Sequence, residues 1–133
     1  MNWALDTNVL VRHLVEDDGP QRVRVERALR RALGRGELLT ISLPVLLETE
    51  WVLRSRYGFG KPDVLRAFRG LLESFDVRIE SLHVVAEALH VWADSRADFA
   101  DCLFASHHRR LGCDGTWTFD ARALRVPGFI ALP

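Results

Sequence analysis

The sequence predicts an α/β protein in which a central, mostly parallel β-sheet is flanked by helices. Short β-prone runs alternate with longer segments whose apolar residues recur at helical spacing. Strands that alternate with helices in this way form parallel sheets with right-handed crossovers. Hydrophobic residues make up 48% of the 133 residues, which is typical of a folded globular protein. We therefore expect a single domain over residues 1–133.

Residues 5–10, with the sequence Leu-Asp-Thr-Asn-Val-Leu, establish this pattern at the start of the chain. The apolar residues 3–5 predict a short buried strand, and the apolar residues that follow have helical spacing. Asp6 would then stand at the carboxyl end of the strand, where open α/β sheets bind ligands. The simpler interpretation is a helix cap, because the side-chain oxygens of Asp, Thr and Asn accept hydrogen bonds from the free N–H groups of a helix start.

The following segments continue the alternation up to the middle of the chain. Apolar periodicity predicts a helix over 21–33, and the β-prone run 38–41 predicts a second strand. Ser42 and Pro44 mark the start of a helix that continues to about residue 56. A further helix is expected from residue 62, with an apolar face that runs from Val64 to Phe75.

The second half of the chain repeats the pattern with shorter strands. Residues 77–79 alternate like a strand, and Ser81 is expected to cap a helix that turns Leu82, Val85, Leu89 and Trp92 inward. A helix over 98–111 is followed by a β-prone run over 115–119. One helical turn over 120–124 and a strand over 126–132 are expected to end the chain.

Charge and cysteine content limit the possible functions. The chain has 18 basic and 18 acidic residues, so net charge gives no argument for a nucleic-acid partner. No apolar run approaches the ~18 residues of a membrane span, and no signal peptide is visible. Cys102 and Cys113 lack the spacing of metal or redox motifs. We expect a reduced, cytoplasmic protein without a membrane segment.

Glu48 is the first carboxylate without an evident surface partner. It is flanked by apolar residues, and no basic residue lies one helical turn away. A carboxylate on an apolar face is costly unless it is paired or binds a metal. Glu50, by contrast, has Arg54 four residues later, which is the favourable order for a surface ion pair. We therefore predict that Glu48 is functional and that Glu50 lies on the surface.

Asp98, Asp101 and Asp120 extend this set of acidic residues. Asp98 and Asp101 stand at the start of a predicted helix, where capping and the helix dipole favour negative charge. Asp120 follows a strand as Asp6 does, and it could cap the next turn. Asp101 also lacks a cation within its own helix. Carboxylates that converge at strand and helix ends have the oxygen ligands that Mg²⁺ or Mn²⁺ prefers.

The acidic segments of the chain resemble a known family, the PIN-domain nucleases, and especially the VapC toxins of bacterial toxin–antitoxin pairs. Four segments carry the resemblance in the family's order, and they are residues 5–12, 46–53, 98–103 and 118–120. Pro127-Gly128 before a closing strand is also similar to the family. No single motif is specific, but the ordered set spans nearly the whole chain.

The resemblance implies a PIN-like three-layer fold with strand order 3-2-1-4-5 and hydrolysis of RNA phosphodiester bonds with Mg²⁺. It assigns the acidic quartet, as metal ligands and catalytic residues, to Asp6, Glu48, Asp101 and Asp120. Asn8, Asp98 and Thr118 would support the quartet. It also implies a homodimer and a cognate VapB-like antitoxin that blocks the site.

Two interpretations remain for the arginine-rich helix. Arg22, Arg24, Arg27 and Arg31 could follow RNA phosphates, because such contacts are mainly electrostatic. The alternative, which we favour, is a solvated helix face. The sequence therefore leaves an RNA-binding role for these arginines open.

Other functions fit the sequence less well. A PIN-domain nuclease of RNA processing without an antitoxin would share the same residues. A phospho-acceptor signalling domain would need a lysine near the last strand, but the only lysine is Lys61. A dehalogenase-like phosphatase would need an acid where Asn8 stands, and an intact quartet argues against a non-catalytic scaffold. A hydrolase that uses Cys102 is disfavoured because this cysteine is expected in the core.

Overall fold

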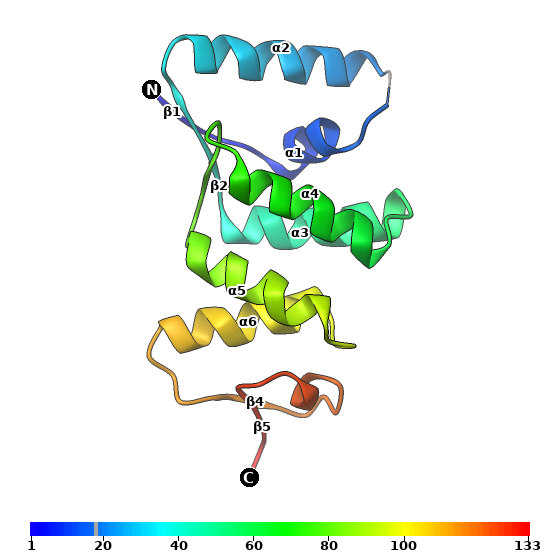
Figure 1. The fold of residues 1–133 in the computed structure, drawn as a ribbon, viewed down its shortest axis with the longest axis vertical. Helices are drawn as coiled ribbons and strands as arrows, with labels where there is room; N and C mark the ends of the chain where they lie inside the picture. Colours follow the sequence, from blue (N-terminus) through cyan, green and yellow to red (C-terminus); the bar gives the residue numbers. More distant parts are fainter. Residues whose placement is uncertain (18) are drawn as a thin grey trace. The chain divides into compact units, whose positions relative to one another are not determined.

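The computed structural model describes residues 1–17 and 19–133. They form two compact units, Met1–Glu80 and Ser81–Pro133, which are described separately (Figure 1). None of the helices in the described ranges is long and apolar enough to cross a membrane. The predicted α/β class is confirmed, with helices and parallel strands in both units.

The first unit is built around a parallel three-stranded sheet. Its strands are β1 (Asn2–Ala4), β2 (Leu38–Ile41) and β3 (Arg78–Ile79), in the order β1-β2-β3. The register pairs residue 4 with residue 40, and residue 41 with residue 79. This order agrees with the expected 3-2-1 arrangement. Since β1 is an edge strand of this sheet, its residues are exposed, and the predicted burial of the first strand is wrong apart from Leu5.

Four helices pack around this sheet. They are α1 (Thr7–Leu14), α2 (Pro20–Gly34), α3 (Leu43–Arg56) and α4 (Lys61–Glu73). Helix α1 contacts α2 and α3, and α3 contacts α4 (Figure 1). The most deeply buried apolar side chains of the unit include Leu10, Ile41, Leu46, Leu53, Val64 and Phe68.

The carboxyl ends of the three strands carry polar residues that cap helices. Asp6 follows β1 and caps α1. Ser42 follows β2, and its hydroxyl accepts a hydrogen bond from the backbone N–H of Val45 at 3.3 Å. Glu80 follows β3, and its Oε1 accepts from the backbone N–H of Leu43 at 2.7 Å. These bonds satisfy N–H groups that a helix start leaves without partners.

The second unit combines two packed helices with a parallel strand pair. Helices α5 (Leu82–Ala93) and α6 (Phe99–Arg110) pack along each other. Strands β4 (Thr116–Thr118) and β5 (Phe129–Ala131) pair in parallel, which agrees with the end of the expected order. A short 3₁₀ helix, Ala123–Arg125, lies on the connection between them.

Two predicted details are wrong. Phe75 lies beyond the end of α4 and is fully exposed, so the apolar face of this helix ends earlier than its periodicity suggested. Ser81 occupies the cap position of α5 with a φ of 51°, and its side chain makes no capping hydrogen bond to the described residues. The inward positions Val85, Leu89 and Trp92 are confirmed, but Leu82 is 42% exposed.

Candidate active site

Three aspartates gather near the start of α6 in the second unit. Asp98 occupies the cap position of this helix in an extended conformation, and Asp101 lies in its first turn. The side chain of Asp98 does not cap the helix; its Oδ1 lies 3.8 Å from Nη2 of Arg122. Asp98 therefore occupies the predicted cap position with its backbone, but its side chain does not cap the helix. Its carboxylate instead lies near Arg122, in the connection after β4.

The turn after β4 is ordered by two local hydrogen bonds. Thr118 Oγ1 accepts from the backbone N–H of Asp120 at 2.9 Å, and Asp120 Oδ1 accepts from the backbone N–H of Arg122 at 2.8 Å. Threonine and aspartate side chains commonly form such bonds two residues ahead in turns. Thr118 thus fixes Asp120, and Asp120 fixes the backbone that carries Arg122.

Asp101 is the most perturbed carboxylate of this cluster. Partial burial raises its pKa above the ordinary value of 3.8, and the negative charges of Asp98 and Asp120 raise it further. The positive charge of Arg122 acts in the opposite direction. Within the described residues, the Asp101 carboxylate has neither a hydrogen bond nor an ion pair. The cluster therefore carries more negative charge than its one neighbouring arginine neutralises.

Asp6 in the first unit combines an exposed side chain with a capping role. Its Oδ1 accepts a hydrogen bond from the backbone N–H of Thr7 at 2.8 Å, which confirms the helix-cap interpretation for this residue. Asn8 is exposed in the first turn of α1, whereas Thr7 is buried. The other carboxylate oxygen of Asp6 takes no part in this bond.

The two glutamates of α3 lie on the opposite faces to those predicted. Glu48 is exposed, and Glu50 is only 3% exposed. Residues 43, 46, 49, 50 and 53 form the buried face of the helix, and this spacing places Glu50 on that face. The predicted ion pair with Arg54 is present, with Nε 2.9 Å from Oε2, but only its arginine end is exposed. Glu48 is therefore accessible to water and ions without being part of an apolar face.

The donor chemistry of these residues suits a hard divalent cation. Asp6, Glu48, Asp101 and Asp120 offer only oxygen ligands, and Asp101 shows the charge repulsion that a cation would relieve. No three His, Cys, Asp or Glu side chains in the described ranges are close enough together to hold a metal ion. The metal site stays a prediction, with Asp6 and Glu48 in the first unit and Asp101 and Asp120 in the second.

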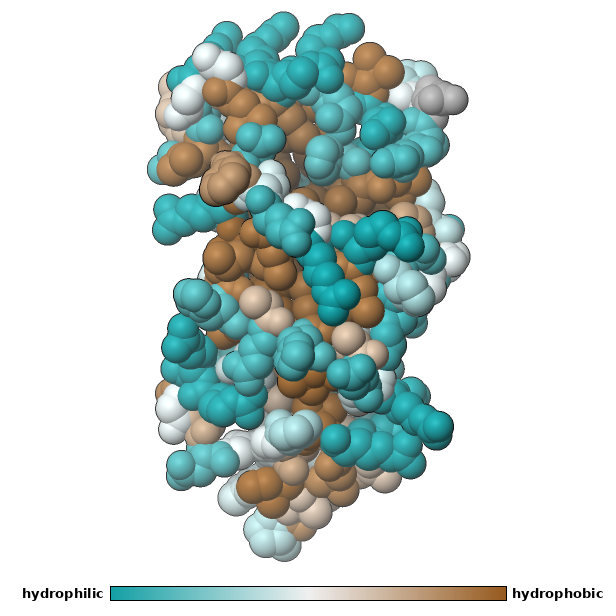
Figure 2. Space-filling model, viewed as in Figure 1, coloured by the Kyte–Doolittle hydropathy of each residue, from teal (hydrophilic) through white to brown (hydrophobic). Residues whose placement is uncertain are grey.

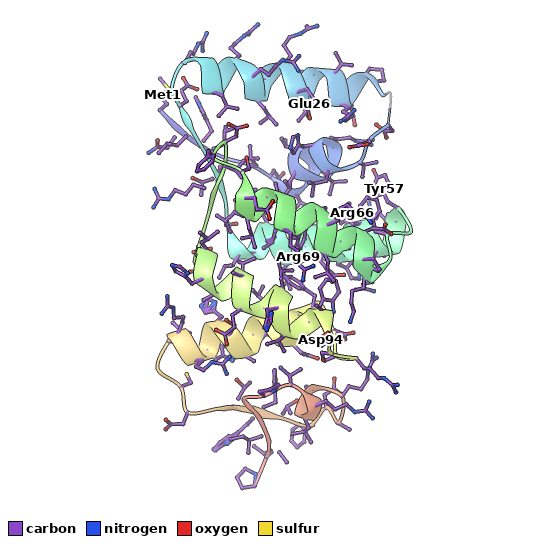
Figure 3. All side chains as sticks on the ribbon, viewed as in Figure 1. Met1, Glu26, Tyr57, Arg66, Arg69 and Asp94 are labelled. Atoms are coloured by element: carbon purple, nitrogen blue, oxygen red, sulfur yellow. The ribbon has the colours of Figure 1, made fainter. Side chains whose placement is uncertain are left out.

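The arginines of α2 differ from one another in exposure. Arg24, Arg27 and Arg31 are exposed, and hydrophilic side chains line the outer side of this helix in Figure 2. Arg22 is half-buried, and its Nε is buried without a hydrogen-bond partner among the described residues. Arg22 also lines a cavity of about 850 Å³ with Glu26, whose position on α2 can be followed in Figure 3. Of the four arginines that the sequence singled out, Arg24, Arg27 and Arg31 are therefore open to solvent and Arg22 is not fully so.

The residue that the sequence analysis missed at the aspartate cluster is Arg122. It supplies the cation that Asp101 lacks within its own helix, and its Nη2 also donates to the backbone carbonyl of Arg96 at 3.3 Å. The sequence contained a signal, because threonine, aspartate and arginine at alternate positions 118, 120 and 122 favour a side-chain-stabilised turn. That turn directs the arginine back towards the start of α6.

The model of the PIN domain family matches residues 4–128. The chain belongs to the PIN domain family. The match extends over both units and contains all four residues of the predicted quartet, Asp6, Glu48, Asp101 and Asp120. The resemblance that the four motifs indicated is therefore confirmed at the level of the family.

One of the solved structures that are similar to this chain is that of a bacterial protein. The crystal structure of VapC20 from Mycobacterium tuberculosis, described as a toxin that cleaves the sarcin–ricin loop, is 19% identical. The alignment covers 99% of this chain and 98% of that protein, with a TM-score of 0.42. A comparison with curated proteins gives no match.

Proposed function

We propose that this PIN domain is a Mg²⁺-dependent endoribonuclease, and that it acts in the cytoplasm as the toxin of a VapBC-like toxin–antitoxin pair. The observation that carries the proposal is the PIN domain match over residues 4–128, which contains Asp6, Glu48, Asp101 and Asp120. The pKa of Asp101, raised by burial and by Asp98 and Asp120, agrees with it. Carboxylates that repel each other at a helix start favour a divalent cation. Membership of the PIN family and the order of the four motifs support the assignment of the remaining residues.

Asp6 and Asp101 are the proposed primary ligands of Mg²⁺, which when bound lowers the pKa of a water molecule and stabilises charge on a phosphate. Mn²⁺ could take its place. Glu48 and Asp120 are exposed carboxylates that would bind a second ion or accept a hydrogen bond from the attacking water. Thr118 would keep Asp120 in place through the hydrogen bond of its hydroxyl to the Asp120 backbone.

Binding of RNA would use positive charge that is exposed on α2 in the first unit. Arg24, Arg27 and Arg31 are exposed on α2 and could contact phosphates. Arg22 is a weaker candidate, because part of its guanidinium group is buried. The alternative of a solvated helix face predicts no loss of RNA affinity when the three exposed arginines are replaced together by glutamine.

Cleavage of RNA by the full chain tests the proposed activity. We expect cleavage of single-stranded or structured RNA with Mg²⁺ or Mn²⁺ and none with excess EDTA. Asp101→Asn should lose most of the activity, and Glu73→Gln, an exposed change in the last turn of α4, should keep it. Equal cleavage with EDTA, in protein free of other nucleases, would overturn the proposal.

Expression in a bacterial host distinguishes a toxin from a nuclease of RNA processing. A toxin should arrest growth, and co-expression of a small partner encoded beside it should restore growth. Asp101→Asn serves as the inactive control. RNA cleavage in vitro without growth arrest would favour RNA processing without an antitoxin.

Assembly as a homodimer is also part of the proposal. The apolar faces of α4 and α5 offer little free surface for it, because Val64, Phe68, Val85 and Leu89 are each 1% exposed in the monomer. The dimer is therefore supported by the family resemblance. Light scattering at micromolar concentration should give twice the monomer mass of 15.1 kDa, and a monomeric mass would contradict this part of the proposal.

A further inference from the structure

We propose that a cavity of about 850 Å³ in the first unit is a nucleotide site that holds the 5′-phosphate of its ligand with arginine side chains. Residues of α1, α2 and α4 and of the loop between α3 and α4 line this cavity. Its volume lies in the range of small-molecule sites. None of Asp6, Glu48, Asp101 and Asp120 lines it, so this inference does not rest on the proposed function.

Arg22 on α2 provides the observation that points to an anion. Its side chain is half-buried, and its Nε is buried without a hydrogen-bond partner among the described residues. Buried polar groups are normally hydrogen-bonded, and a guanidinium nitrogen without an acceptor is costly. Since Arg22 lines the cavity, an anion bound there would supply the missing acceptor through a charge-assisted hydrogen bond.

The carboxylates of the cavity already have other partners or face water. Oε1 of Glu26 lies 2.6 Å from Nδ1 of His13. Oδ2 of Asp63 accepts a backbone hydrogen bond at 2.8 Å at the start of α4, and Glu16 is exposed. Within the described ranges, no ion pair joins any of them to Arg22. The positive charge of Arg22 is therefore available to a ligand.

Arg66 on α4 brings a second guanidinium group to the same cavity. Its Nη1 lies 3.7 Å from Oδ1 of Asp63, and the two side chains are 79% and 49% exposed. Exposed pairs of this kind contribute little stability, so the guanidinium group can turn to a ligand at small cost. A phosphate monoester, which carries roughly two negative charges at pH 7, suits two arginines better than a single carboxylate does.

Aromatic and apolar side chains complete the lining. Tyr57 and Phe59 follow the end of α3, and Leu14 ends α1. Figure 3 labels Glu26, Tyr57 and Arg66, which line the cavity from α2, from the end of α3 and from α4. Nucleobases stack on aromatic rings with little regard to their identity. A ligand with a phosphate at one end and a base at the other therefore matches both parts of the lining.

Titration calorimetry of the full chain in EDTA tests the ligand class without any metal or cleavage. We expect adenosine 5′-monophosphate (AMP) to bind with a Kd below about 1 mM. Adenosine and inorganic phosphate should each bind at least about tenfold more weakly, because each lacks one half of the ligand. A 5′-phosphorylated RNA dinucleotide identifies the source: affinity equal to that of AMP indicates an RNA end, and weaker binding a free nucleotide.

Variants that line the cavity should weaken AMP binding. Arg22→Met should weaken it by at least about tenfold, because a charge-assisted hydrogen bond is lost. Arg66→Gln and Tyr57→Ala, which change exposed residues, should each weaken it about three- to tenfold. Arg30→Gln on α2 and Arg69→Gln on α4 are the matched controls, since both residues are exposed and neither lines the cavity. They should change the affinity by less than about twofold.

Thermal melts separate an anion ligand from a structural arginine. Without ligand, Arg22→Met should melt at the same temperature as wild type or higher, because an uncompensated buried nitrogen is removed. AMP should raise the melting temperature of wild type and not that of the variant. If Arg22→Met does not fold, Arg66→Gln and Tyr57→Ala decide the test.

Four results would overturn the nucleotide site. They are no binding of AMP at millimolar concentration, binding of inorganic phosphate as tight as that of AMP, unchanged AMP affinity in the lining variants, and an equal loss in the two controls. N-acetylaspartate that binds as tightly as AMP would also overturn it, in favour of an acidic segment of a partner protein. Cleavage of RNA by wild type is measured separately, so the proposed function stands or falls independently of these results.

Discussion

Nε of Arg54 lies 2.9 Å from Oε2 of Glu50, whose side chain is only 5% exposed. The pair spans one turn of α3 and places a carboxylate on the buried face of the helix. Loss of one partner of a buried charge pair leaves the other without compensation, although Arg54 is half exposed and can regain water. We expect Glu50→Ala to lower the free energy of unfolding by about 1–3 kcal/mol, measured by urea denaturation.

Glu48→Ala is the matched control on the same helix. Glu48 is exposed, so its loss should change the free energy of unfolding by less than about 0.5 kcal/mol. Under the proposed function, Glu48→Gln should nevertheless abolish most RNA cleavage. A larger loss of stability for Glu48 than for Glu50 would contradict the faces that the structure assigns to them.

Gly128 is needed for its backbone conformation. Its φ of +103° is a value that residues with a Cβ rarely adopt, and its carbonyl accepts a hydrogen bond from Thr116 at 2.8 Å where β4 begins. Gly128→Ala should therefore cost about 1–3 kcal/mol, seen as a lower melting temperature. Gly70→Ala provides the contrast, because Gly70 lies within α4 and a Cβ there would meet no atom within 4 Å. It should stabilise the protein by about 0.5–1 kcal/mol. Equal effects of the two changes would contradict the backbone described here.

The order of the elements could be predicted because local signals and packing agree over most of the chain. Ser42 caps α3, Asp6 caps α1 and the β-prone run at 38–41 is a strand, as the sequence indicated. The face of α3 could not be predicted in the same way. Apolar residues occur on all sides of this helix, including Trp51, which is 51% exposed. A pattern without a polar side does not determine which of two glutamates is buried.

The aspartate cluster could be predicted in part. Asp98 and Asp101 share a helix start, so their proximity follows from sequence spacing. The approach of Asp120 and Arg122 depends on how the connection after β4 folds, and periodicity carries no information about that connection. The side-chain hydrogen bonds of Thr118 and Asp120 order this turn, and turn chemistry was the only local signal for it.

The last prediction concerns stability as a function of pH and metal. In the folded protein the pKa of Asp101 is raised above 3.8, first by burial and then by Asp98 and Asp120. A carboxyl with a raised pKa holds its proton more tightly in the folded state. As pH rises from 3.8 through the raised value, ionisation costs more in the folded than in the unfolded protein, so stability falls and stays lower above that range.

Asp101→Asn removes this ionisation. In EDTA at neutral pH the variant should melt at the same temperature as wild type or higher, and the difference should disappear below the ordinary pKa of 3.8. Added Mg²⁺ should stabilise wild type by linkage and the variant less. Asp114→Asn, an exposed change outside the cluster, should behave like wild type under all conditions.

A purely structural role for Asp101 predicts a different outcome. Asp101 lies in the first turn of α6, where the helix dipole favours a negative charge. Were that its main effect, Asp101→Asn would lose about 0.3–1 kcal/mol at neutral pH, with or without metal. Burial and the negative charges of Asp98 and Asp120 oppose the stabilisation by the helix dipole. Because the pKa of Asp101 is raised overall, these destabilising effects are the larger ones. A uniform loss with EDTA and with Mg²⁺ would therefore remove Asp101 from the proposed metal site, whereas a variant that is stable in EDTA and insensitive to Mg²⁺ would support it.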